Sequence, residues 1–85
     1  MERFQYTITD SIGIHARPAG ELAKLARGFQ SEITVKTEKK QADAEKLMAV
    51  MALGIHHGDT VTVEIEGADE KEALAAVREF FEAKL

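Results

Sequence analysis

Apolar and polar side chains alternate in three stretches of the chain, over residues 2–9, 32–37 and 61–66. Successive side chains of a strand point to opposite faces, so each stretch presents one apolar and one polar face. This pattern is typical of an antiparallel sheet that is covered on one side only. Residues 38–43 are expected to turn back as a short further strand, although they lack the Asn-Gly or Asp-Gly pair that best fits a two-residue turn. The apolar faces consist of Phe4, Tyr6, Ile8, Ile33, Val35, Val61, Val63 and Ile65.

Two other stretches repeat with the period of an α-helix. Residues 16–27 carry an apolar stripe, and Gly28 after them tolerates the left-handed conformation that closes many helices. The last helix is predicted to start at a capping box, in which Asp69 accepts early amide hydrogens and Glu72 reaches back. The stripes consist of Ala19, Leu22, Leu25 and Ala26 in the first helix and Leu74, Val77, Phe81 and Leu85 in the last.

Residues 47–53 form a run without any polar side chain. A helix that is apolar all round is usually buried, but a two-layer domain of 85 residues has little material to surround one. We therefore expect one side of this segment to be exposed as a surface for a partner protein, with plain burial as the alternative. Leu47, Met48 and Met51 would form its soft apolar patch.

The elements follow one another in the order β-α-β-β-α-β-α. This order, with one polar face on each strand, predicts an α/β (α+β) fold. We expect an open-faced sandwich in which three helices cover one face of a four-stranded antiparallel sheet. The length suits a single domain over residues 1–85, because it leaves no room for a second core.

Composition narrows the class of protein. With 45% hydrophobic and 31% charged residues, the chain matches ordinary soluble globular domains. Its net charge of -4 opposes attraction to nucleic-acid phosphates, and no apolar run approaches membrane-spanning length. There is no cysteine, and the first residues lack the pattern of a signal peptide. We expect a cytoplasmic protein that binds no nucleic acid and is not inserted into a membrane.

The segment SIGIHARPAG, residues 11–20, places a histidine at the expected start of the first helix. If His15 is the N-cap residue, the first-turn amides lack partners inside the helix and the helix dipole favours an anion there. Pro18 is tolerated in a first turn, and the guanidinium of Arg17 suits phosphate oxygens. A neutral imidazole is also a nucleophile near neutral pH. The segment therefore predicts a phosphate site with a nucleophile inside it, with a capping histidine beside a solvated arginine as the alternative.

These residues carry a resemblance to a known family. The segments GIHARPA, SEITV, ADAEKLMAVMALGI and GADEKEAL resemble those of the histidine-containing phosphocarrier (HPr) family of the bacterial phosphoenolpyruvate-dependent sugar phosphotransferase system. The likeness covers nearly all 85 residues. It implies that Nδ1 of His15 accepts a phosphoryl group from Enzyme I and passes it to the IIA domains of sugar permeases. It also implies the strand order 1-4-2-3.

The resemblance further implies roles for individual residues. Arg17 would stabilise the phosphoryl group, and the backbone amides of Ala16 and Arg17 would bind it at a helix start set by Pro18. The protein would be a phosphoryl carrier rather than an enzyme, with no cofactor. A monomer is expected, because a dimer through the apolar patch would block docking. The partner surface would comprise Gly20, Lys24, Arg27, Leu47, Met48 and Met51, although the two cations are also interpretable as ordinary solvated charges.

Position 46 departs from the family pattern. Many members have a serine there that a kinase phosphorylates, whereas this chain has Lys46. A regulatory serine, and the corepressor role that depends on it, are therefore not expected. Lysine is a poor N-cap residue, and Asp43 is the candidate for an earlier helix start. Gly20 is costly inside a helix; it either lets a partner approach closely or has no role.

Two further hypotheses concern metal binding and a different function. His56, His57 and Asp59 are candidate ligands of a metal site, but three ligands without a fourth make a weak zinc site, and no metal is expected.

The alternative function is a regulatory module that binds a target through the apolar patch without transferring phosphoryl groups. A carrier devoted to nitrogen or other regulation is a related variant. His15 argues against pure binding, since binding alone requires no nucleophile at a helix start.

Overall fold

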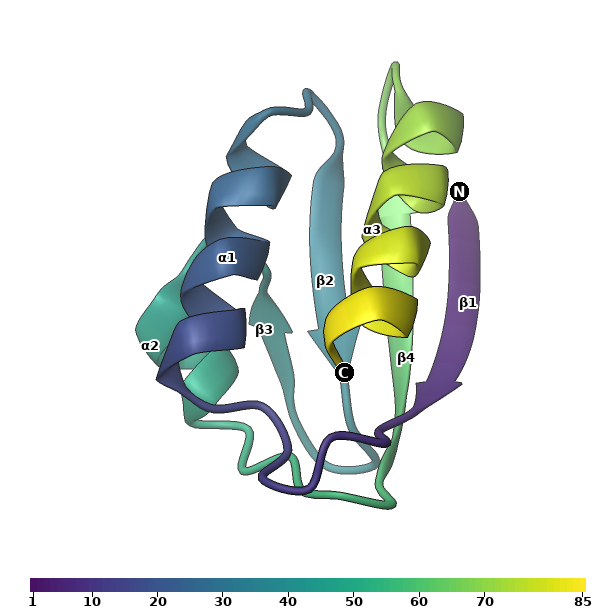
Figure 1. Ribbon diagram of the computed structural model, residues 1–85. Helices are drawn as coiled ribbons and strands as arrows, with labels where there is room; N and C mark the ends of the chain where they lie inside the picture. Colours follow the sequence, from purple (N-terminus) through teal and green to yellow (C-terminus); the bar gives the residue numbers. More distant parts are fainter.

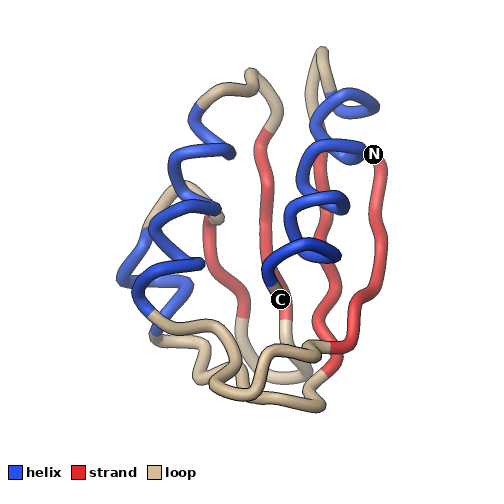
Figure 2. Tube along the Cα trace, viewed as in Figure 1, coloured by secondary structure: helices blue, strands red, loops and turns tan.

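The computed structural model describes residues 1–85 as a sheet with helices on one side of it (Figure 1). The strands are β1 (Glu2–Thr7), β2 (Glu32–Lys36), β3 (Gln41–Asp43) and β4 (Thr60–Glu66). They pair only antiparallel, in the order β1-β4-β2-β3. The helices are α1 (Ala16–Arg27), α2 (Leu47–Met51) and α3 (Glu70–Lys84), and Figure 2 shows α1 and α3 in front of the strands, with α2 beside α1. The predicted open-faced sandwich and its strand order are confirmed. None of the helices has the length and hydrophobicity that crossing a bilayer requires.

The hydrophobic core lies between the sheet and the helices. Val63 in β4 pairs with Phe4 on one side and with Val35 on the other, and all three residues are buried. From α3, the ring of Phe81 meets Phe4 and Tyr6 edge to face, with 5.6 Å between ring centroids in each pair. Such a pair adds about 0.5 to 1.5 kcal/mol beyond the burial of its surface. The alternating apolar positions of the strands thus form the floor of the core.

The end of α1 differs from the prediction. The helix covers residues 16–27 as expected, but Gly28 has a φ of -78°, which is right-handed rather than left-handed. The amide of Gly28 donates to the carbonyl of Leu25, and the amide of Phe29 donates to that of Ala26. These shorter bonds tighten the last turn and satisfy its carbonyls, so no left-handed residue is needed. The predicted left-handed closure was wrong.

The predicted capping box at the start of α3 was also wrong. Asp69 occupies the N-cap position, but its side chain makes no capping hydrogen bond. Its carboxylate instead accepts the amides of Gln30 and Ser31, each at 2.9 Å, and the Ser31 hydroxyl. Glu70 rather than Glu72 reaches back, accepting the Gly67 amide at 3.1 Å. The competing donors come from the turn before β2, which tertiary packing brings to this helix start.

The segment before α2 forms a turn rather than an earlier helix start. The carboxylate of Asp43 accepts the amide of Glu45 at 2.9 Å, and its carbonyl accepts the amide of Lys46 at 3.0 Å. Lys46 is the N-cap residue and makes no side-chain capping bond. Asp43 therefore shapes the entry to α2 but does not begin the helix.

β1 is shorter than predicted and ends at Thr7 instead of Thr9. Beyond it, the amides of Thr9 and Asp10 both donate to the carbonyl oxygen of Leu85, at the end of α3. The Thr9 hydroxyl donates to the same oxygen at 3.0 Å. The chain therefore leaves the sheet for the C-terminal end of α3 and then runs on toward α1.

Candidate functional site

The approach to α1 is set by a glycine that no other residue could replace without strain. Gly13 has a φ of +87°, and a Cβ added there would lie 2.4 Å from the carbonyl oxygen of Ile55. The next residue, Ile14, is buried and donates its amide to that same oxygen at 3.1 Å. The loop after α2 thus holds the chain immediately before His15. The side chain of His15 is 39% exposed, so it reaches solvent from an anchored backbone.

The first turn of α1 leaves two amides without partners inside the helix. His15 is the N-cap residue, with an extended backbone and no side-chain capping bond. Its carbonyl accepts the amide of Ala19 at 3.0 Å, which is the first bond of the helix. Pro18 has no amide hydrogen, so the donors that remain belong to Ala16 and Arg17. These are the two amides that the family resemblance assigns to phosphate binding, beside a histidine on the same turn.

Arg17 extends from this turn into solvent. It is exposed, and none of the four ion pairs of the structure involves it. A guanidinium without a carboxylate partner keeps all its donors for an incoming anion. A helix start, bare amides and a free guanidinium therefore lie within a few residues of one imidazole.

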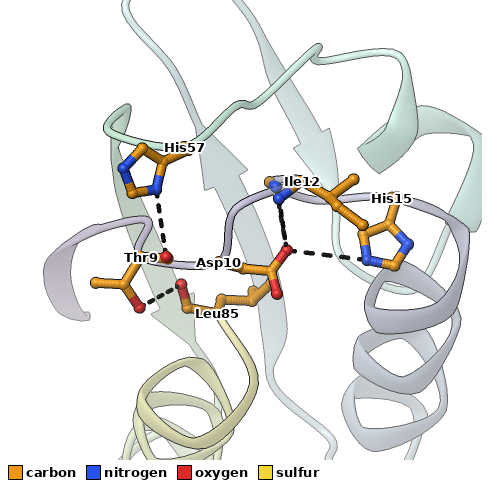
Figure 3. Close-up of polar contacts among 7 residues, drawn as sticks. Thr9, Asp10, Ile12, His15, His57 and Leu85 are labelled. Carbon is orange, nitrogen blue, oxygen red and sulfur yellow. Dashed lines mark hydrogen bonds and ion pairs between the residues drawn. The ribbon is translucent and has the colours of Figure 1, made fainter.

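The carboxylate of Asp10 lies beside His15, a neighbour that the sequence did not predict. Oδ2 of Asp10 lies 4.0 Å from Nε2 of His15 (Figure 3). The same oxygen accepts the amides of Ile12 at 3.0 Å and Gly13 at 3.2 Å. Aspartate often bonds the backbone two residues on in this way, so an Asp three residues before a glycine was the available signal. That signal predicts the turn, but it does not indicate that the carboxylate of Asp10 lies beside the imidazole of His15.

The two histidines of the α2–β4 loop have local roles. Nδ1 of His57 lies 3.2 Å from the carbonyl oxygen of Thr9, next to Asp10 (Figure 3). His56 lies beside Asp59, with 3.9 Å between Nδ1 and Oδ2. No three His, Cys, Asp or Glu side chains of the structure are placed to hold a metal ion together. The loop thus supports the backbone that leads to His15.

The residues expected to form a partner surface lie on α1 and on α2, which pack against each other. A Cβ added to Gly20 would have nothing within 4 Å. Lys24 is exposed, and Nη2 of Arg27 donates to the carbonyl of Glu45 at 3.0 Å. Arg27 therefore ties the end of α1 to the entry of α2 as well as presenting charge.

The apolar segment has the exposed side expected of it. Val50 is fully buried, whereas Met48 is 74% and Met51 37% exposed. Leu47 is half-buried against the core. Ile12, which is 63% exposed in the loop before His15, was not singled out from the sequence and adds another apolar side chain near the site.

This fold and site define a class of small open-faced sandwich that presents a histidine at a helix start, beside two free amides and a free guanidinium. The family model described as the PTS HPr component phosphorylation site matches residues 2–83. The chain belongs to this family.

Individual relatives agree with the family match. A phosphocarrier protein HPr of Mycoplasma genitalium is 44% identical over 79 residues, which cover 92% of this chain and 90% of the relative. The structure of HPr-C-His from Thermoanaerobacter tengcongensis is 36% identical, with a TM-score of 0.92, and 99% of this chain and 94% of that chain are covered. A mycoplasma histidine-containing phosphocarrier protein is 39% identical, with a TM-score of 0.91 and coverage of 93% and 90%. These matches favour the phosphocarrier over a regulatory module that transfers no phosphoryl group.

Proposed function

We propose that this protein accepts a phosphoryl group on Nδ1 of His15 from Enzyme I and passes it to the IIA domains of sugar permeases. The observation that carries the proposal is the half-exposed imidazole on a turn whose two free amides and free guanidinium suit phosphate oxygens. No hydrogen bond or ion pair of the structure engages Nδ1, so no protein group blocks the approach of a phosphorus atom to this nitrogen. The protein acts as a covalent carrier between two partners and not as an enzyme.

The transfer step conserves bonds and charge. The Nδ1 lone pair of His15 attacks the phosphorus of a phosphohistidine on the donor protein, in line with the bond that breaks. The donor's nitrogen–phosphorus bond breaks, and its electron pair returns to the donor ring. Arg17 and the amides of Ala16 and Arg17 stabilise the charge on the phosphoryl oxygens, each charge-assisted bond contributing about 1.5 to 3 kcal/mol. The same geometry in reverse releases the group to a IIA domain, and the carrier supplies no metal or cofactor.

We propose that the partners dock on the surface formed by α1 and α2 beside His15. Exposed methionines adapt to different partners, and the neighbouring cations favour partners with acidic docking faces. A monomer in the cytoplasm fits this use, because self-association through the apolar patch would cover the site. Residues 1–85 act as one unit in this proposal. The docking residues are Gly20, Lys24, Arg27, Leu47, Met48 and Met51.

The first experiment is intact-mass spectrometry after incubation with phosphoenolpyruvate, magnesium and a bacterial Enzyme I. We expect one phosphoryl adduct that is lost on brief acid treatment, because a phosphorus–nitrogen bond to imidazole is acid-labile. His15→Ala should abolish the adduct. His56→Ala is the matched control, since His56 is an exposed histidine outside the site, and it should leave the adduct unchanged. An adduct that survives in His15→Ala would show that the proposal is wrong.

A further inference from the structure

The carboxylate of Asp10 is the acidic group that faces the ring of His15. The distance from Oδ2 to Nε2 is 4.0 Å, within reach of an ion pair but too long for a hydrogen bond. The two side chains are 32% and 39% exposed, so solvent screens their interaction only in part. No other carboxylate forms an ion pair with His15.

Asp10 is held in this place from several directions. Its amide donates to the carbonyl of Leu85 at 2.8 Å, and the carbonyl of the preceding residue, Thr9, lies 3.2 Å from Nδ1 of His57. Its carboxylate accepts two backbone amides of the following turn. Hydrogen bonds therefore hold both its backbone and its side chain, and Figure 3 shows the one with the amide of Ile12. A charge held in this way acts on one edge of the imidazole, the edge that carries Nε2.

We propose that Asp10 is a positioning residue for phosphoryl uptake, which places the ring proton of His15 on Nε2 and leaves the lone pair on Nδ1. A negative charge favours a nearby N–H over a nearby lone pair, because the N–H dipole points its positive end at the carboxylate. The neutral imidazole has one proton for two nitrogens, so a preference at Nε2 is equally a preference for a free Nδ1. This inference rests on the proposed function, in which Nδ1 is the attacking atom.

The carboxylate of Asp10 also stabilises the positive charge that the transfer creates on the ring of His15. When the Nδ1 lone pair forms the bond to phosphorus, the ring keeps its proton on Nε2 and gains positive charge. The donor ring loses that positive charge as its bond to phosphorus breaks. The carboxylate of Asp10 faces the nitrogen on which the new charge is shared and stabilises it there. No proton has to leave His15 during the step.

The test compares the wild-type chain with Asp10→Asn by nitrogen-15 NMR of the His15 ring, recorded for the neutral form of the imidazole. Asparagine keeps a carbonyl oxygen for the two turn amides, so the substitution removes the charge and preserves the turn. We expect the population ratio of the Nε2–H to the Nδ1–H form to fall about twofold. The carboxylate acts on the N–H dipole of a neutral ring, so the effect lies at the low end of the range for a partly exposed charge pair. Asp10→Ser, which also keeps an acceptor, should give the same shift.

Asp59→Asn is the matched control, because it removes an equal charge that lies beside His56 instead of His15. It should leave the His15 tautomer ratio unchanged. The single-turnover rate of phosphoryl uptake from Enzyme I should fall about two- to fivefold in Asp10→Asn and not in Asp59→Asn. An unchanged tautomer ratio in both Asp10 variants would overturn the proposal. The ring measurement needs no partner, so it tests the role of Asp10 independently of Enzyme I. If Enzyme I did not phosphorylate the wild-type chain, that result would contradict the proposed function but not the effect of Asp10 on the ring.

Discussion

Single residues decide how the chain enters the site, and Gly13 is the clearest case. Its positive φ is strained for any residue with a side chain, and a Cβ there would lie 2.4 Å from the Ile55 oxygen and 2.7 Å from Cα of His56. The contacts are with backbone, which cannot rotate out of the way. The fixed position of His15 therefore depends on the absence of a side chain two residues earlier.

We expect Gly13→Ala to lower the free energy of unfolding by about 1 to 3 kcal/mol, the cost of holding a residue in a sparsely populated backbone conformation. It should also slow phosphoryl uptake, because relief of the clash displaces the loop that leads to His15. Urea unfolding curves of the wild-type and variant chains measure the first effect. A variant as stable as the wild type would show that the backbone at this point is free to relax.

Gly20→Ala is the matched control, and we expect it to change the free energy of unfolding in the opposite direction. Gly20 lies in the interior of α1 with nothing within 4 Å of an added Cβ. Alanine should raise the free energy of unfolding by about 0.5 to 1 kcal/mol, because glycine loses more conformational freedom in a helix. Slower uptake from Enzyme I in this variant would indicate that a partner approaches α1 closely at this residue.

At the scale of elements, Asp69 joins the start of α3 to the turn that precedes β2. The Ser31 hydroxyl, followed by the amide of Gln30, holds the pKa of Asp69 below its ordinary value of 3.8. Ser31 is buried, and an added Cβ at Gly67 would lie 2.6 Å from its Cα. The three charge-assisted contacts of one carboxylate thus connect segments that are distant in sequence.

This connection predicts a pH dependence of stability. A pKa lowered in the folded chain means that the unfolded chain binds more protons near pH 3.8, so the stabilisation is complete above that value. It is lost as the pH falls through the lowered pKa. Asp69→Asn should therefore be less stable than the wild type at neutral pH, and the difference should shrink as the solution is acidified.

Thermal unfolding from neutral to strongly acidic pH measures this difference. Glu72→Gln is the control, because no hydrogen bond or ion pair of the structure involves Glu72 although the capping-box pattern assigned it one. The stability of Glu72→Gln should equal that of the wild type at every pH. A difference between Asp69→Asn and the wild type that stays constant with pH would contradict the role of the Asp69 charge.

At the scale of the whole molecule, charged side chains are distributed unevenly over the surface. The chain carries a net charge of -4, yet the cations Arg17, Lys24 and Arg27 all belong to α1. The exposed apolar side chains of α2 lie on the neighbouring helix. Helix α1 therefore carries three cations and one acidic residue, Glu21, on an acidic protein, and it lies beside exposed apolar side chains. This arrangement supports the proposal that the partners have acidic docking faces.

We expect Met48→Asp to weaken the affinity for Enzyme I at least about fivefold, because it places a charge at the centre of the proposed contact. Ala75→Asp is the matched control, since both variants change the net charge by the same amount and Ala75 is exposed on α3. Titration calorimetry measures both affinities. Equal affinities for the two variants would remove α2 from the docking surface.

The sequence by itself determined most of the elements and marked His15 as the candidate for the reactive residue. Periods of two and of about 3.6 residues are local properties, so the three longer strands and the extent of α1 could be predicted from them. The exposed side of α2 followed instead from the length of the chain, because a domain of 85 residues has little material to surround an apolar helix. The first turn of a helix is equally local. A histidine, an arginine and a proline within four residues were enough to predict a phosphate site, and the resemblance then supplied its chemistry.

Only the tertiary structure decided the contacts between distant segments. The Asp69 carboxylate was available to its own helix, but the buried Ser31 turn, 38 residues earlier, competes for it and binds it. Likewise, Thr9 and Asp10 leave the strand because the end of α3 offers a carbonyl, and the carboxylate of Asp10 then lies beside His15. A local pattern specifies which hydrogen-bonding groups a segment offers. Which of them meet depends on how the packed sheet and helices bring the ends of the elements together.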